Sequence, residues 1–160
     1  MDKNREKWFL AIASNDLIAI DHMLEKGYKV NVLNDEQQSA LQIVAKKLSA
    51  SILELDWDAE KLLKEISATL VIHGANQEDL GHGGGDACDI SRAITIHTIK
   101  LATKKGRLES INKMIENGDI WFPEKLISGK EQFLRAVNRK DIFSIEKMFN
   151  YDLIGFPPSQ

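Results

Sequence analysis

An internal repeat of short apolar segments limits most strongly what this chain can fold into. Three stretches, residues 8–12, 99–103 and 133–137, align without gaps, and a polar turn follows each of them. Beyond each turn the apolar residues recur at i, i+3 and i+7, a spacing that predicts an amphipathic helix. These second stripes are Leu17, Ile20 and Leu24; Leu108, Ile111 and Ile115; and Ile142, Ile145 and Phe149. One helix pair of this length cannot bury its apolar face alone, so neighbouring pairs must cover one another.

A further unit lies between the first two aligned segments. Residues 39–45 follow the first helix pair, and Ile43 stands 33 residues after its counterpart Leu10. We expect this second unit to be interrupted around Leu48 to Asp58. It resumes with a stripe of Leu63, Ile66 and Leu70.

With this 33-residue period the chain resembles the ankyrin-repeat family. Residues 27–34 and 39–45 are similar to the loop and first-helix start of an ankyrin unit, and Gly74-Ala75-Asn76 repeats the opening of that loop. The Thr-Pro-Leu-His tetrapeptide of the family is intact nowhere. The resemblance implies an all-α, ankyrin-like solenoid of stacked helix-turn-helix repeats with irregular insertions. It forms a single domain, 1–160, with units at roughly 5–34, 35–79, 90–122 and 128–156.

Small residues and turn formers fit such a stack. Glycines stand just past each expected second helix, where a left-handed backbone is costly for a side chain. Alanines stand where first helices pack, and Ser128 with Glu131 fits a capping box. The glycines are Gly27, Gly74 and Gly118, and the alanines are Ala11, Ala45, Ala102 and Ala136.

The composition excludes several classes of protein. A net charge of −3 disfavours a dedicated nucleic-acid binder, and one cysteine provides no disulfide framework. The apolar run at residues 8–13 is too short for a signal-peptide core or a membrane span. We therefore expect a cytoplasmic chain that is monomeric when unbound and has no membrane partner.

The most enzyme-like stretch runs from Gly81 to Cys88 and contains His82 and Asp86. It lacks the Gly-Lys-Ser/Thr ending of a Walker loop, and the chain has no Gly-x-Ser-x-Gly elbow. A flexible insertion is the favoured interpretation, and a small hydrolase that uses this loop is the alternative. We expect no enzymatic activity and no cofactor.

Metal binding by histidine and cysteine is disfavoured by spacing. The separations of His73, His82, Cys88 and His97 match none of the paired spacings of structural zinc sites, so no metal site is expected. His73 falls near the carboxyl end of a helix, where it interacts favourably with the helix dipole.

The resemblance implies that a partner binds the concave side formed by fingertips and first helices. Cations recur there in three units and predict a basic ridge made of Lys46, Lys47, Lys104, Lys105 and Arg139, suited to an acidic partner. The alternative is that these are ordinary solvated helix ends.

Apolar anchors are expected on the fingers. Leu33, with Asp35 beside it, projects from the first fingertip, and Trp121 with Phe122 occupies the third or forms a local core. Trp57 is either an exposed anchor or a buried pin for the insertion.

These features predict a protein-protein interaction module that binds, masks or tethers a partner protein. Small divergent ankyrin-like proteins are frequent in intracellular bacteria. By that association the chain is alternatively an effector or adaptor that acts on host proteins inside the host cell.

Overall fold

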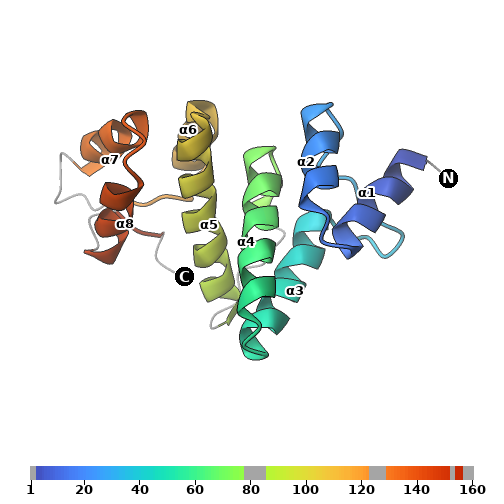
Figure 1. The fold of residues 1–160 in the computed structure, drawn as a ribbon. Helices are drawn as coiled ribbons and strands as arrows, with labels where there is room; N and C mark the ends of the chain where they lie inside the picture. Colours follow the sequence, from blue (N-terminus) through green and yellow to red (C-terminus); the bar gives the residue numbers. More distant parts are fainter. Residues whose placement is uncertain (1–2, 78–85, 123–128, 152–153, 157–160) are drawn as a thin grey trace. The chain divides into compact units, whose positions relative to one another are not determined.

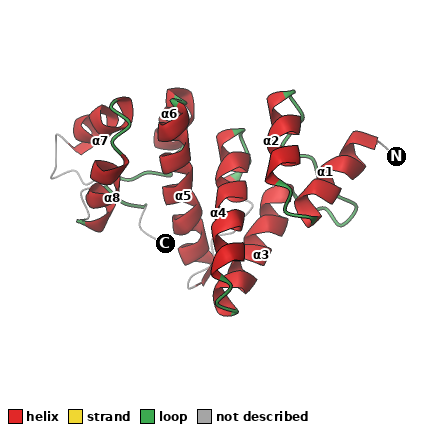
Figure 2. Cartoon of the chain, viewed as in Figure 1, coloured by secondary structure: helices red, strands yellow, loops and turns green. Residues whose placement is uncertain are grey.

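The described part of the chain is all-helical, as the repeat predicts. The computed structural model describes residues 3–77, 86–122, 129–151 and 154–156, without the side chains of 86–89. In these residues the only extended pairings are the isolated bridges Leu33–Ser39 and Trp121–Gly155. Figures 1 and 2 show the eight helices: α1 (Lys3–Ala13), α2 (Leu17–Glu25), α3 (Ala40–Leu53), α4 (Trp57–Ile72), α5 (Asp86–Lys105), α6 (Leu108–Glu116), α7 (Gly129–Asn138) and α8 (Ile142–Asn150).

The chain forms two compact units, residues 1–98 and residues 99–160, and the division falls within α5. In the first unit α1 packs against α2 and α3, while α4 packs against α2 and α3. In the second unit α7 packs against α8. Among the described residues, no helix combines the length and apolar character needed to cross a bilayer.

The core of the first unit follows the predicted stripes. Trp8 is fully buried, and its ring centroid lies 5.2 Å from that of Tyr28. The predicted stripe of Leu63, Ile66 and Leu70 is buried along α4, which confirms the spacing argument for that helix.

The turn between paired helices has the same geometry four times. The backbone N–H of the residue before each second helix donates to the carbonyl oxygen five positions earlier. The residue immediately before each donor has a positive φ. The donor–acceptor pairs are Asp16–Ala11, Asp56–Ser51, Arg107–Ala102 and Asp141–Ala136, and the positive-φ residues are Asn15, Leu55, Gly106 and Lys140. At three of the four turns the aspartate side chain also accepts a hydrogen bond from the first turn of the second helix.

The interruption expected around Leu48 to Asp58 is present as added helical length and not as a break in the helices. Helix α3 continues to Leu53, and α4 begins at Trp57. Helix α4 has 16 residues, against 9 in α2, and seven residues are about two helical turns. Helix α3 is also longer than α1, with 14 residues against 11, and Leu41 and Leu48, which lie seven residues or about two turns apart on α3, are both buried. The α3–α4 hairpin consequently projects past the α1–α2 turn (Figure 1).

The second unit has its own apolar centre. Ile111, Phe133 and Ile145 are fully buried, as their positions in the repeat predict. The prediction for Leu108 is wrong, because this first residue of α6 is exposed. The expected capping box at Ser128 lies outside the described residues.

Candidate functional site

Three large apolar side chains are exposed at the tip of the α3–α4 hairpin. Leu53 is 76% exposed, Leu55 is 64% exposed and Trp57 is 66% exposed. They lie within five consecutive residues at the turn that the helix extension carries outward. We call these three residues the apolar tip. The Trp57 indole is on the surface, so it is not a buried pin, and its role as an anchor stays a prediction.

Acidic side chains alternate with the apolar ones at this tip. Glu54 and Asp58 are exposed, and so is Asp56, whose carboxylate accepts a hydrogen bond from the backbone N–H of Ala59 at 3.2 Å. The tip therefore presents apolar surface inside a negatively charged rim. Leu53 and Leu55 were not predicted from the sequence. The alternation of apolar and acidic residues over 53–58 was the available signal, and the assumption of an interruption hid it.

Lys47, one of the predicted ridge residues, binds within the chain. Its ammonium donates to the carbonyl oxygens of Ile12 and Ala13 at 3.0 and 2.9 Å, and to Oδ1 of Asn15 at 3.1 Å. These carbonyls stand at the carboxyl end of α1, which has no other basic residue in its last turn. Burial lowers the pKa of Lys47 from its usual value. The side chain thus joins α3 to the end of α1.

Lys46 is exposed beside it, but it is not at a helix end, as the solvated-end alternative supposes. The turn follows α3 only at Glu54, so Lys46 lies in the middle of its helix. Lys104 and Lys105 instead are the last residues of α5. A basic ridge that joins Lys46 to Lys104 would cross both units and stays a prediction.

The second unit brings its cations together at two turns. Lys104 and Lys105 end α5, and Arg139 and Lys140 follow α7; all four are exposed. The ammonium of Lys140 lies 3.8 Å from the point where a Cβ on Gly106 would stand, so the two turns are adjacent. We call these four residues the basic cluster.

The first finger is held to α1 by an arginine. Arg5 donates from Nε to the carbonyl oxygen of Leu33 and from Nη2 to the carboxylate of Asp35, each at 2.9 Å. Leu33 is exposed and pairs with Ser39 across the finger. Both predicted fingertip residues are therefore on the surface, with the Asp35 carboxylate in an ion pair.

Trp121 and Phe122 have different environments. Trp121 is 44% exposed, and its backbone pairs with Gly155 through bonds of 2.7 and 2.8 Å. The ring of Phe122 packs edge-on against buried Phe133 with centroids 5.7 Å apart. Phe122 thus belongs to the local core, while Trp121 presents part of its indole outward.

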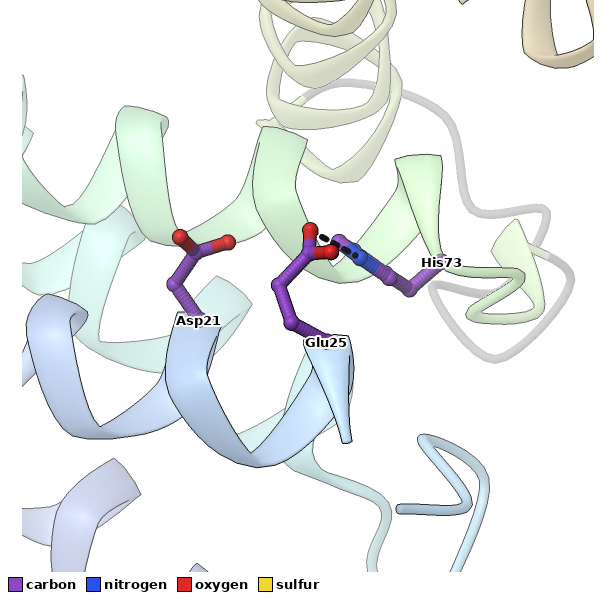
Figure 3. Close-up of side chains that lie close together, drawn as sticks. All are labelled: Asp21, Glu25 and His73. Atoms are coloured by element: carbon purple, nitrogen blue, oxygen red, sulfur yellow. Dashed lines mark hydrogen bonds and ion pairs between the residues drawn. The ribbon is translucent and has the colours of Figure 1, made fainter. Parts of the chain in front are cut away.

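A mixed cluster of ligating side chains lies between α2 and α4 (Figure 3). Asp21 and Glu25 are four residues apart and so share one face of α2, and His73 caps the carboxyl end of α4. One ligand atom from each residue lies within 4.8 Å of the other two. His73 Nδ1 is 2.9 Å from the carbonyl oxygen of Thr69, and Nε2 is 3.3 Å from a carboxylate oxygen of Glu25. The expectation of His73 near a helix carboxyl end is confirmed.

The glycine-rich stretch from Gly81 lies largely outside the described residues, as does the side chain of Cys88. The loop that the alternative hydrolase would use therefore lies largely outside the described residues. Comparison with family models, with curated proteins and with solved structures gives no match.

Proposed function

We propose that this chain is a noncatalytic binding module that uses the apolar tip to bind another protein. The occupant of the tip is an apolar cleft with a basic rim on the surface of the partner. Its mechanism is occupancy: the bound module masks, inhibits or tethers the protein that carries the cleft. The exposure of Leu53, Leu55 and Trp57 together on a projecting hairpin is the observation that carries this proposal.

Ankyrin-like repeats are the architecture we propose for the module. The four turns with a shared hydrogen bond support it, as does the finger between α2 and α3. Asn31, on that finger, donates from Nδ2 to the carbonyl oxygen of Gly74 at 3.1 Å and accepts from the backbone N–H of Asn76 at 3.2 Å. A side chain of one proposed repeat thus bonds to the corresponding loop of the next repeat, as expected where each repeat contacts only its neighbours.

The energetics favour the tip as an anchor. Full burial of a Leu or comparable apolar side chain contributes about 1.5–3 kcal/mol. Tryptophan is among the residue types most enriched in interface hot spots. Because the turn protrudes, the three side chains can enter a cleft without rearrangement of α3 or α4.

The charge around the tip specifies the partner's chemistry. Glu54 lies between Leu53 and Leu55, and Asp58 follows Trp57, so a basic rim on the partner is complementary and an acidic rim is repelled. Such complementarity acts mainly on the association rate and on its dependence on salt.

The test begins with a photo-crosslinking amino acid at Leu55, used in the native cell to identify the partner. The purified partner is then titrated with Trp57→Ala and with Leu10→Ala, whose residue is 68% exposed on α1 and serves as the matched control. We expect Trp57→Ala to weaken binding at least about 30-fold, equivalent to about 2 kcal/mol, and Leu10→Ala to leave it within about twofold.

Charge reversal tests the rim separately. Glu54→Lys with Asp58→Lys should slow association several-fold at low salt, and the effect should shrink at high salt. A partner that binds Trp57→Ala as tightly as the unaltered chain, or that presents an acidic surface to the tip, contradicts the proposal.

The basic cluster is a second candidate surface, for an acidic segment of a partner. The adjacency of the two turns that carry Lys104, Lys105, Arg139 and Lys140 favours it. Lys104→Glu with Lys105→Glu should weaken binding of such a segment, and binding that is insensitive to both changes retires this surface. Steep salt dependence with a polyphosphate, in place of an acidic peptide, would instead assign the cluster to nucleic acid.

A further inference from the structure

The contact of His73 with the Thr69 carbonyl determines which ring nitrogen carries a proton. A backbone carbonyl only accepts, so Nδ1, 2.9 Å from the Thr69 oxygen, carries a proton. In the neutral imidazole Nε2 then carries a lone pair and is an acceptor. It lies 3.3 Å from a carboxylate oxygen of Glu25, which is an acceptor as well. Two acceptors at this distance need a positive charge that they share. The second imidazole proton supplies one such charge, and a metal ion supplies another.

The donor set and its spacing fit a metal ion. Imidazole nitrogen and carboxylate oxygen are both ligands of zinc, and two ligands at the tetrahedral angle on Zn²⁺ lie roughly 3.3 Å apart. The separation of His73 Nε2 from Glu25 matches this value. The Asp21 oxygen is within 4.8 Å of both, so a change of the Asp21 rotamer can complete the set.

The surroundings of His73 resemble those of a metal-binding histidine. Its side chain is only 10% exposed, which limits its freedom, and its ring points toward the carboxylates (Figure 3). Donation of the distal N–H to a backbone carbonyl is the usual means by which a ligating imidazole is oriented and made more basic.

We propose that Asp21, Glu25 and His73 bind one divalent transition-metal ion, with Zn²⁺ as the matching probe. The three protein ligands leave the fourth tetrahedral position to water. The ion joins α2 to α4, the second helices of neighbouring pairs, and so strengthens the stacking of the first unit. This role is separate from partner binding at the apolar tip.

The experiment is isothermal titration of the full chain with ZnCl₂ at pH 7.5, followed by urea unfolding with and without the ion. Glu25→Gln removes one carboxylate from an exposed position. Glu116→Gln is the matched control, because Glu116 ends α6 two residues before Gly118 as Glu25 ends α2 two residues before Gly27. MgCl₂ serves as the hard-cation control.

We expect one Zn²⁺ per chain, a higher urea midpoint with Zn²⁺, and reversal by EDTA. Glu25→Gln should weaken binding at least tenfold, Glu116→Gln should leave it unchanged, and Mg²⁺ should bind far more weakly. His73→Gln, with folding checked by circular dichroism, should abolish the site. Absence of Zn²⁺ binding at up to about 1 mM overturns the proposal, as does equal binding by the unaltered chain and Glu25→Gln, which would place the ion elsewhere.

Discussion

Replacement of Lys47 by methionine tests how the first two helix pairs are joined. The substitution keeps most of the aliphatic stem but removes the ammonium that donates to Ile12 O, Ala13 O and Asn15 Oδ1. A hydrogen bond to a charged group contributes about 1.5–3 kcal/mol when buried. The bond to Ala13 is exposed and the other two are partly buried, so water compensates part of the loss. We therefore expect a net destabilisation of about 1–2 kcal/mol.

Urea unfolding at pH 7.5, followed by circular dichroism, measures this loss. With an m-value of about 2 kcal/mol/M, the midpoint should fall by roughly 0.5–1 M. Lys46→Met is the matched control, because Lys46 is the exposed neighbour, and it should change stability by less than about 0.5 kcal/mol. Equal midpoints for the two variants would refute the reasoning and return the Lys47 ammonium to the predicted basic ridge.

Two further predictions concern single side chains. Asn31→Ala removes the hydrogen bonds to Gly74 and Asn76 and should destabilise the first unit by about 1–2 kcal/mol, measured by urea unfolding. A loss of stability no larger than that of an ordinary surface substitution would count against this role of Asn31. Hydrogen bonds from the Ser144 side chain and backbone lower the pKa of Asp141, so its contribution is complete above its usual pKa of 3.8 and is lost as the pH falls through the lower, folded value. Unfolding between pH 6 and pH 2 should show a shallower acid dependence in Asp141→Asn, which retains a good helix cap, and identical acid profiles would contradict this assignment.

Much of the helical pattern was predictable because it rests on local periodicity. The positions of Ile20, Ile111 and Ile145 in the i, i+3, i+7 stripes gave their burial correctly. The prediction for Leu108 failed: this first residue of α6 is 41% exposed, whereas Ile111 and Met114 further along the helix are buried.

The extension of α3 and α4 was not recognised for a physical reason. A strict 33-residue period demands a turn near Leu48, but two added helical turns restore the same face and leave no break in the apolar pattern. Ser39 and Gln42 form a capping box at the start of α3, and their spacing in the sequence was an unused signal.

The candidate sites depend on contacts that sequence spacing conceals. Glu25 and His73 are 48 residues apart and meet only because α2 packs against α4. Lys47 was correctly placed on a first helix. The sequence does not indicate, however, that backbone carbonyl oxygens at the end of α1 accept hydrogen bonds from its ammonium. Exposure of Trp57 likewise followed from the length of the hairpin, which periodicity did not reveal.

The dissociation rate of the complex formed with the purified partner, identified by crosslinking, measures whether the apolar tip anchors that partner. Trp57 is the largest side chain of the apolar tip and should leave a fully desolvated pocket slowly. We predict that Trp57→Ala dissociates at least about tenfold faster than Leu10→Ala, while the two free variants unfold at the same urea concentration. Equal dissociation rates for these variants would show that the tip does not anchor the partner.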